Sequence, residues 1–263
     1  MKPSAFDYER PKDIPGALKL LNAESKFLAG GQSLGPMLNL RIVHPSLLVD
    51  VSGIDELKQV GDEKDSVTLG ACITHSQIED GRVPDPSRGL MRHVASRIAY
   101  RAVRNRGTIG GSLSHADPAA DWPSALALLN GVAIVQGQKG KREIPLDRFV
   151  TGLFTTALQD GEILAAIRIP KLSAKARWGW WKFTRKAGEF AQAIGAALHD
   201  PERGVSRAVI GALRAAPLVI ANARQCDPAA EAAKVCSDPY ERQLHAVALK
   251  RAIAQLEQEP QWR

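Results

Sequence analysis

Residues 27–33 read FLAGGQS, and residues 104–121 read RNRGTIGGSLSHADPAAD. Each stretch carries a Gly-Gly pair that lies close to an apolar run and to small hydroxyl side chains. Such a pair lets backbone N–H groups approach an anion without a side chain in the way, and it allows turns with positive φ. One pair alone is typical of an ordinary turn. Two such loops predict a site that grips a dinucleotide from two sides.

The surroundings of each loop support this prediction. The first loop is expected to follow a strand at residues 26–29 and to precede a short helix at residues 35–42, whose positive end would face the loop. The second loop offers the hydroxyls of Thr108 and Ser112. The sequence has no G-x-x-x-x-G-K-[ST] and no G-x-G-x-x-G followed by an acid, so neither a Walker-type site nor a Rossmann site is indicated.

The composition is that of a globular protein. The chain has 263 residues, of which 44% are hydrophobic and 24% are charged, enough for one large domain or two small ones. No run approaches the ~18 apolar residues of a membrane span, and residues 1–10 lack the apolar core of a signal peptide, so we expect a cytoplasmic location. The net charge is +7, but the basic residues are scattered and no nucleic-acid-binding pattern occurs.

Metal and disulfide sites are not indicated. Three cysteines occur without C-x-x-C spacing, and no histidine pair has the H-E-x-x-H pattern of a zinc site. Among the histidines, we expect His75 to begin a helix. His115 is expected to line the cofactor pocket or to satisfy a local backbone bond.

Short strands alternate with helices along the chain, which indicates an α+β fold. Helices are expected at residues 13–23, 88–103 and 122–130, and hairpins at residues 57–71 and 132–146. The polar segment 171–177 is the best linker candidate. Beyond it we expect strands at 178–184, 190–198 and 206–213, followed by helices at 217–225 and 240–258.

The segments AGGQSLGPMLNLRIVHPSLLVDVS (29–52) and RNRGTIGGSLSHADPAADWPSALALL (104–129) closely resemble the FAD-binding medium subunit of bacterial molybdenum hydroxylases. That family includes the flavoprotein subunits of carbon monoxide dehydrogenase and xanthine dehydrogenase. The resemblance continues through residues 161–170, 182–191 and 240–253. It implies an α+β fold of the p-cresol methylhydroxylase and vanillyl-alcohol oxidase type at residues 1–172, with subdomains of about 1–56 and 57–172. A C-terminal domain at 173–263 would hold a three-stranded antiparallel sheet plus helices.

The resemblance also implies an oxidoreductase subunit that binds FAD. Electrons would come from [2Fe-2S] clusters on a small partner subunit, while molybdopterin would lie on a large one, and the complex is expected to be a dimer of heterotrimers. From the charge pattern and the hydropathy we expect no nucleic-acid partner and no membrane span. Covalent attachment in related oxidases uses a histidine in a GGH-type loop. Gln32 stands there in this chain, so we expect noncovalent FAD. Neither the substrate nor the terminal acceptor can be read from the sequence.

Site residues carry over from the family motifs. The first loop is expected to wrap the pyrophosphate, and the second loop is expected to close the other side. Asp117 and Asp121 are expected to accept hydrogen bonds from ribityl or ribose hydroxyls, with N-capping of a helix as the alternative. Lys182 matches a flavin-contacting lysine, although an exposed strand lysine is an alternative. The predicted cofactor-binding residues are Ala29, Gly30, Gly31, Gln32, Ser33, Leu34, Thr108, Ile109, Gly110, Gly111, Ser112, Asp117, Asp121, Leu164 and Lys182.

Two departures from the family pattern and two rival functions stay open. Trp180 replaces the usual tyrosine two places before Lys182, and His44 stands where a basic residue is commoner. Phe190 follows Gly188 and is expected either to cover the flavin or, more simply, to be a buried core residue. The rivals are a flavin reductase similar to UDP-N-acetylenolpyruvoylglucosamine reductase and a scaffold subunit that has lost FAD.

Overall fold

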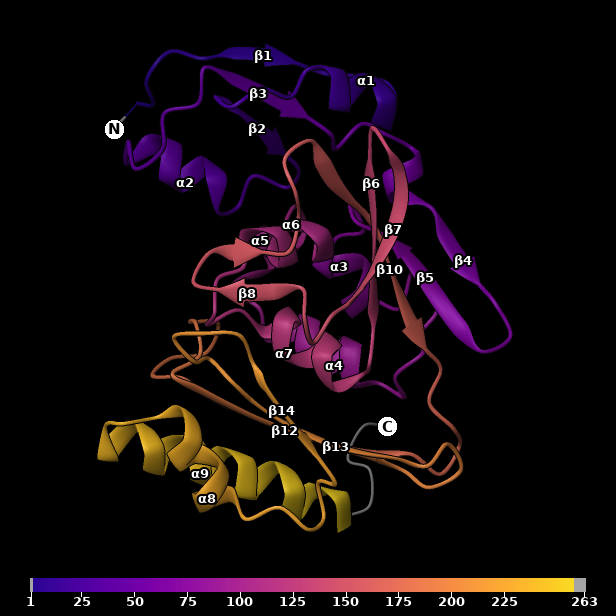
Figure 1. The fold of residues 1–263 in the computed structure, drawn as a ribbon, viewed down its shortest axis with the longest axis vertical. Helices are drawn as coiled ribbons and strands as arrows, with labels where there is room; N and C mark the ends of the chain where they lie inside the picture. Colours follow the sequence, from indigo (N-terminus) through magenta and orange to yellow (C-terminus); the bar gives the residue numbers. More distant parts are fainter. Residues whose placement is uncertain (1, 258–263) are drawn as a thin grey trace.

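The computed structural model describes residues 2–257, which form three stacked parts (Figure 1). The N-terminal part contains a three-stranded parallel sheet in the order β1 (Asp7–Glu9), β3 (Leu47–Asp50), β2 (Ser25–Leu28), with helices α1 (Ile14–Lys19) and α2 (Leu34–Asn39). The Asp13 side chain caps α1 by accepting from the Gly16 N–H at 2.7 Å, as its position before Pro15 suggested.

The middle part is built on a five-stranded antiparallel sheet. Its order is β4 (Val60–Asp62), β5 (Ser66–Gly70), β10 (Glu162–Pro170), β6 (Val132–Gly137), β7 (Gly140–Pro145). Between β5 and β6 the chain forms helices α3 (His75–Glu79), α4 (Leu90–Ser96), α5 (Arg101–Arg104), α6 (Ile109–His115) and α7 (Asp121–Leu128). The small hairpin of β8 (Val150–Gly152) and β9 (Thr155–Thr156) follows β7.

The C-terminal part contains a four-stranded antiparallel sheet in sequence order, formed by β11 (Arg177–Phe183), β12 (Ala193–Asp200), β13 (Val205–Gly211) and β14 (Leu218–Ala221). Helices α8 (Pro228–Val235) and α9 (Pro239–Ala254) follow, and η2 (Gln255–Glu257) ends the described residues. Within them, the α+β class is confirmed. The expected three-stranded sheet is wrong, because Leu218–Ala221, inside the helix expected at 217–225, forms a fourth strand; the β-branched Val219 and Ile220 suit that strand.

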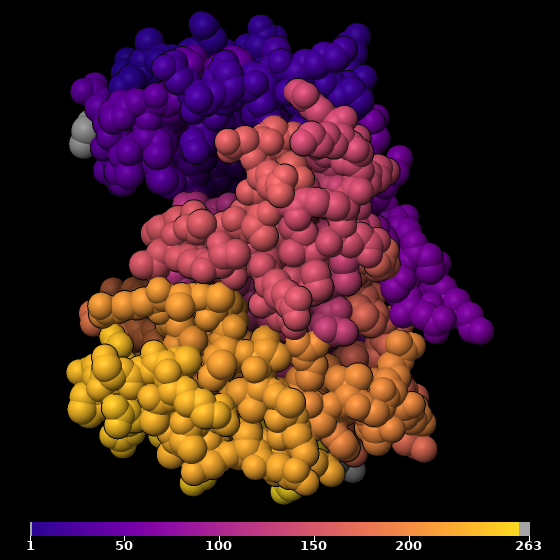
Figure 2. Space-filling view, viewed as in Figure 1, coloured from indigo at the N-terminus to yellow at the C-terminus, as the bar shows by residue number. Residues whose placement is uncertain are grey.

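The C-terminal sheet is covered on both faces. Helix α7 of the middle part contacts β12 and β13, while α9 packs on β11 and β12. Trp178 and Trp180 are 2% and 3% exposed and belong to the same hydrophobic cluster as Trp122 and Leu126 of α7. This shared core ties the C-terminal part to the middle part. Figure 2 shows the surface hollowed between the indigo N-terminal part and the magenta middle part.

Replacing Gly195 by alanine is expected to destabilise the C-terminal sheet. A Cβ atom there would overlap the backbone of Ala248 in α9, so the helix would have to move off the sheet. Overpacking of this kind costs about 1–3 kcal/mol. Urea denaturation should show the loss, whereas Gly152→Ala, where the nearest atoms lie at 3.9 Å, should change stability by less than about 1 kcal/mol. Equal stability of the two variants would contradict this packing.

Candidate functional site

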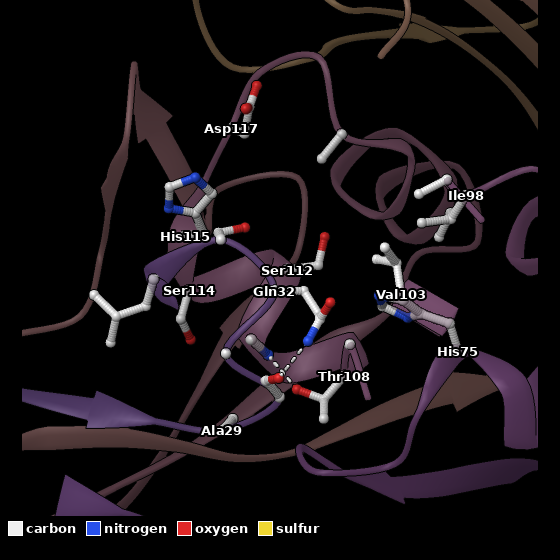
Figure 3. A pocket seen from close by; sticks show the side chains of 18 of the residues that line it. Ala29, Gln32, His75, Ile98, Val103, Thr108, Ser112, Ser114, His115 and Asp117 are labelled. Atoms are coloured by element: carbon white, nitrogen blue, oxygen red, sulfur yellow. Dashed lines mark hydrogen bonds between the residues drawn. The ribbon is translucent and has the colours of Figure 1, made fainter. Parts of the chain in front are cut away.

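A cavity of about 580 Å³ lies where the three parts of the molecule meet. The N-terminal part contributes residues 26–43, the middle part contributes side chains between His75 and Phe154, and the C-terminal part contributes Lys182 and residues 188–190. Figure 3 shows side chains from both glycine loops, among them Gln32 and Thr108, lining this cavity together. The two loops, far apart in the sequence, therefore form one site.

The first loop presents a row of free backbone donors. No backbone N–H from Gly30 to Leu34 donates a hydrogen bond within residues 2–257. The row leads into α2, and the Gln32 carboxamide folds back to the Gly30 carbonyl at 3.0 Å. Because backbone N–H groups are seldom left without an acceptor, the row fits an anionic ligand such as a pyrophosphate.

The two loops touch through glycine. A Cβ atom on Gly30 would overlap the carbonyl oxygen of Arg106, and one on Gly111 would lie 3.8 Å from the Cβ of Ala29. Gly31 has φ +71, a conformation that other residues rarely adopt. Positions 30 and 31 therefore require glycine, and the close approach of Gly30 to Arg106 brings the two loops together at the cavity.

The second loop differs from its expected form. Residues 109–115 are helical, and the N–H groups of this segment are satisfied inside the protein: Ile109 donates to Ile73 at 3.0 Å and Gly110 to Ala71 at 2.9 Å. The Thr108 hydroxyl accepts from Gly111 at 3.0 Å. The second segment therefore lines the cavity with the Ser112 side chain. Its backbone N–H groups at Ile109, Gly110 and Gly111 already donate hydrogen bonds within the protein.

Asp121 and Lys182 form a buried ion pair at the cavity wall. Lys182 Nζ lies 2.8 Å from Asp121 Oδ2, and the two side chains are 6% and 4% exposed. Burial raises the pKa of Asp121, and Lys182 opposes this effect. Asp121 Oδ1 has no hydrogen-bond partner within the described chain. The pair joins α7 to β11. Because Lys182 is buried, the expected alternative of an exposed strand lysine is wrong. The alternative of Asp121 as a helix cap is also wrong, because Ala120 is the N-cap of α7.

Asp117 lies at the same cavity and has a local role as well. Its Oδ1 accepts from the Ala119 N–H at 2.9 Å, which fixes the turn before α7. The second carboxylate oxygen has no partner among residues 2–257 and is available to a ligand hydroxyl. Asp117 therefore closes a turn and caps no helix, since Ala120 is the N-cap of α7 and Ala116 the C-cap of α6, so the expected alternative of helix capping is wrong here too.

Sequence reasoning gave His75 only a structural role, yet this residue lines the cavity. It is the first residue of α3, as expected, and its Nδ1 accepts from the Trp122 indole N–H at 3.1 Å. This bond places the proton of the neutral ring on Nε2. Burial, aided by Arg104, lowers the pKa of His75 to about 4. The ring is therefore a neutral donor at physiological pH.

Protonation of His75 is expected to weaken the fold. Its pKa is about 4 in the folded chain against an ordinary value of 6.5, so its stabilising effect is complete above pH 6.5 and declines as the pH falls toward 4. Between pH 7 and pH 4.5 the free energy of unfolding should fall by roughly 2–3 kcal/mol from this group. His75→Asn keeps an acceptor for Trp122 and should flatten the pH dependence in urea titrations. If the free energy of unfolding of His75→Asn depended on pH as steeply as that of the parent, the lowered pKa of His75 would be refuted.

Two exposed aromatic side chains border the cavity. Phe190 is 62% exposed, so the expectation of a buried core residue is wrong. Phe154 is 60% exposed, has φ 51, and its ring lies 5.2 Å from that of His115. The neighbourhood of His115 matches the expected pocket-lining role. Neither phenylalanine is held by the core, so both rings are available to a bound planar group.

The cavity brings most of the predicted site residues together. Twelve line it: Ala29, Gly30, Gly31, Gln32, Ser33, Leu34, Thr108, Gly111, Ser112, Asp117, Asp121 and Lys182. Three do not. Ile109 and Gly110 are buried behind the wall of α6, and Leu164 is 3% exposed within strand β10. Since FAD binding by these residues is untested, their contacts stay predictions.

Comparisons with known proteins agree with this geometry. A family model described as the FAD-binding domain in molybdopterin dehydrogenase matches residues 4–172. Caffeine dehydrogenase subunit beta of Pseudomonas sp. (strain CBB1) is 37% identical over 206 residues, which cover 77% of this chain and 70% of that protein. The carbon monoxide dehydrogenase medium chain of Hydrogenophaga pseudoflava is 34% identical over 196 residues, 73% of this chain and 68% of that one.

Solved structures extend the similarity to the C-terminal part. A chain of carbon monoxide dehydrogenase from Hydrogenophaga pseudoflava superposes with a TM-score of 0.88 at 28% identity, covering 97% of this chain and 98% of that one. Quinoline 2-oxidoreductase from Pseudomonas putida 86 gives a TM-score of 0.83 at 28% identity, with the same two coverages.

The free donors of the first loop fit the pyrophosphate of FAD, and the two sequence relatives are named as subunits of dehydrogenases. The solved carbon monoxide dehydrogenase from Hydrogenophaga pseudoflava is described as lacking the Mo-pyranopterin moiety of its molybdenum cofactor. Within residues 2–257, no group of side chains is arranged to hold a metal ion, and none of the helices there is long and apolar enough to cross a membrane. The chain belongs to the family of FAD-binding medium subunits of molybdenum hydroxylase-type dehydrogenases.

Proposed function

We propose that this chain is the electron-transfer subunit of a molybdenum hydroxylase. FAD, when bound, supplies a redox centre that takes electrons from [2Fe-2S] clusters of a small partner subunit and yields them to a terminal acceptor. The observation that carries the proposal is the cavity in which five free backbone donors of the first loop face the wall formed by the second. A large molybdopterin subunit would complete the complex, as a dimer of heterotrimers.

The chain's own residues would hold the cofactor without a covalent bond. The N–H groups from Gly30 to Leu34 would bind the pyrophosphate, and the Ser112 hydroxyl and the free Asp117 oxygen would bind hydroxyl groups of the cofactor. Gln32 has a carboxamide where a histidine could form a covalent link, and its side chain is turned toward the Gly30 carbonyl. FAD should therefore leave the protein on denaturation.

The Asp121–Lys182 pair would give the cofactor a nearly neutral neighbour. The lysine was expected to stabilise reduced, anionic flavin, but its charge is largely balanced by a carboxylate 2.8 Å away. We propose that the pair fixes the positions of α7 and β11 at the cavity wall and reduces the positive electrostatic potential that Lys182 alone would produce at the flavin. The same pair links the proposed FAD domain, residues 1–172, to the proposed C-terminal domain, residues 173–263.

Copurification tests the proposal. The tagged chain should carry the small and large partner subunits, and the complex should show the absorbance of oxidised flavin, with bands at about 370 and 450 nm. Acid precipitation should release about one FAD per chain into the supernatant. A complex without flavin would instead favour the scaffold alternative. A chain that binds FAD and oxidises NADPH without any partner would favour the reductase alternative.

A further inference from the structure

His75 carries an unused hydrogen-bond donor at the proposed flavin cavity. The side chain is 5% exposed and lines the cavity. Its Nδ1 accepts from the Trp122 indole, which places the proton of the ring on Nε2. This Nε2–H donates to no acceptor among residues 2–257. A largely buried donor without a partner is costly, so its place at a cavity indicates a ligand that accepts the bond.

The fold holds this nitrogen close to the first loop. An isolated β-bridge pairs Thr74 with Thr108, and the His75 N–H donates to the Gly107 carbonyl at 2.9 Å. A Cβ atom on Gly107 would lie 2.9 Å from His75 Nε2, and one on Gly30 would lie 2.9 Å from the Gly107 Cα. Gly107 therefore lies between His75 Nε2 and Gly30, where the row of free N–H groups begins. Figure 3 shows the His75 ring beside Thr108 in the cavity wall.

The ring is held in one orientation and one charge state. Trp122, which is 0% exposed, donates to Nδ1 at 3.1 Å, and the backbone of His75 is bonded to Gly107. Burial, with Arg104 as the second cause, lowers the pKa of His75 to about 4, so the ring is neutral at pH 7. A neutral imidazole whose Nδ1 accepts can donate only through Nε2. The cavity therefore contains a fixed donor before any ligand binds.

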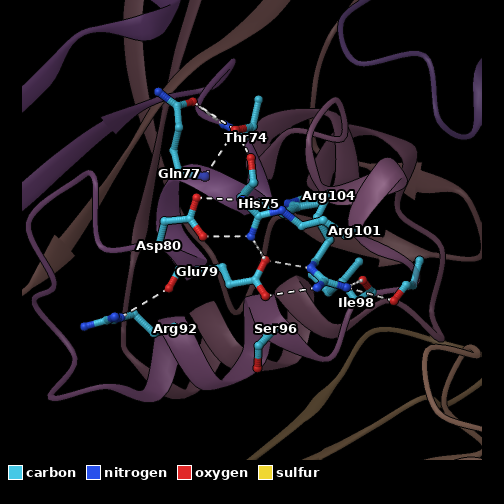
Figure 4. A network of polar contacts seen from close by, with 12 residues as sticks. Thr74, His75, Gln77, Glu79, Asp80, Arg92, Ser96, Ile98, Arg101 and Arg104 are labelled. Atoms are coloured by element: carbon cyan, nitrogen blue, oxygen red, sulfur yellow. Dashed lines mark hydrogen bonds and ion pairs between the residues drawn. The ribbon is translucent and has the colours of Figure 1, made fainter.

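The cation next to His75 is already engaged. Arg104, whose side chain is 12% exposed, donates to the two carboxylate oxygens of Glu79 at 2.8 and 2.9 Å, as Figure 4 shows. It also donates to the Ile98 and Ala99 carbonyls at 3.1 and 3.0 Å. Bound in this way, Arg104 does not line the cavity. At this wall a ligand would therefore meet the uncharged His75 ring and not the Arg104 cation.

We propose that His75 binds the pyrophosphate of FAD by donating its Nε2–H to a phosphate oxygen next to Gly30. The inference rests on the proposed function, because it concerns the same cavity. Phosphate oxygens accept hydrogen bonds from uncharged N–H groups, as they would from the backbone row of the first loop. His75 adds a side-chain donor on the side of the second segment, where the N–H groups of Ile109, Gly110 and Gly111 are already bonded.

Two substitutions separate the roles of the two ring nitrogens. Asparagine reaches the position of Nδ1, so His75→Asn keeps an acceptor for Trp122 but removes the donor at Nε2. Glutamine reaches the position of Nε2, so His75→Gln keeps a donor toward the cavity but removes the acceptor for Trp122. His199→Asn, on β12 and outside the cavity lining, is the matched control.

The flavin-free, full-length chains are titrated with FAD, followed by quenching of flavin fluorescence, and with ADP, followed by calorimetry. ADP carries the diphosphate without the flavin. His75→Asn should weaken the binding of both ligands by about tenfold or more, whereas His75→Gln should stay within about threefold of the parent. His199→Asn should bind as the parent does. Stability should follow the opposite order, with the lower urea midpoint in His75→Gln, because Trp122 loses its acceptor.

A purely structural His75 predicts the reverse ranking, with weaker binding in the less stable His75→Gln. That result would overturn the proposal, as would equal affinities of the two His75 variants. A loss in His75→Asn that affects FAD but not ADP would also overturn it, because the bond would then lie on the flavin half of the cofactor. A parent chain that binds neither FAD nor ADP would instead overturn the proposed function.

Discussion

Gly30→Ala is expected to lower the affinity of the chain for FAD by about a hundredfold or more, equivalent to at least about 2.7 kcal/mol. The added Cβ atom would overlap the carbonyl oxygen of Arg106, which precedes the second glycine segment. Backbone at that point cannot give way as a flexible side chain would, so the two loops must separate. The row of donors from Gly30 to Leu34 would then no longer face the opposite wall.

Gly35→Ala is the matched control for this substitution. It makes the same chemical change five residues later, in α2, and a Cβ atom there meets nothing within 4 Å. Alanine is also the better helix former. Titration of the flavin-free chain with FAD, followed by quenching of flavin fluorescence, should give a control affinity close to that of the parent. Equal affinities for both alanine variants would show that loop contact does not matter.

Asp121→Asn is expected to lower the free energy of unfolding by about 3–5 kcal/mol. The substitution keeps the shape of the side chain but leaves the Lys182 ammonium, 6% exposed, without its counter-charge. Because the pair joins α7 to β11, the loss should fall on the contact between the middle and C-terminal parts. Limited proteolysis near residues 171–177 should become faster, and urea denaturation should report the change in stability.

A surface ion pair provides the comparison. Arg214 and Glu241 lie 3.2 Å apart with side chains 87% and 44% exposed, so Glu241→Gln should cost less than about 1 kcal/mol. The double variant Asp121→Leu with Lys182→Met should recover much of the loss, since it removes both charges from the core. If Asp121→Asn lowered the free energy of unfolding no more than Glu241→Gln does, the Asp121–Lys182 pair would not be the link between the middle and C-terminal parts.

The first glycine loop could be predicted because its function lies in local backbone chemistry. Two glycines and a following helix are enough to specify free N–H groups, and the structure has them at Gly30 to Leu34. The hydrogen bonding of the second loop could not be predicted in this way. Its N–H groups are bonded to Ile73 and Ala71, which lie more than thirty residues earlier, and no local pattern reveals such partners. Its contribution to the site is therefore a wall and hydroxyl groups.

Where the prediction failed, tertiary contacts were responsible. The expected helix at residues 88–103 is broken after Ser96, because Arg104, which is paired with Glu79 of α3, donates to the carbonyls of Ile98 and Ala99 and holds them in a turn. His75 is at a helix start as expected, but its place in the cavity depends on a bond from Trp122, 47 residues away. Phe190 is apolar and could be taken for a core residue. Only the fold shows that it borders the cavity.

A crystal structure of the purified complex with its flavin tests the central claim most directly. We expect pyrophosphate oxygens of FAD to lie within about 3 Å of backbone nitrogens between Gly30 and Leu34, with the Thr108–Ser112 segment on the opposite side. FAD bound elsewhere on the chain, or bound in the cavity without contact to these nitrogens, would contradict the account.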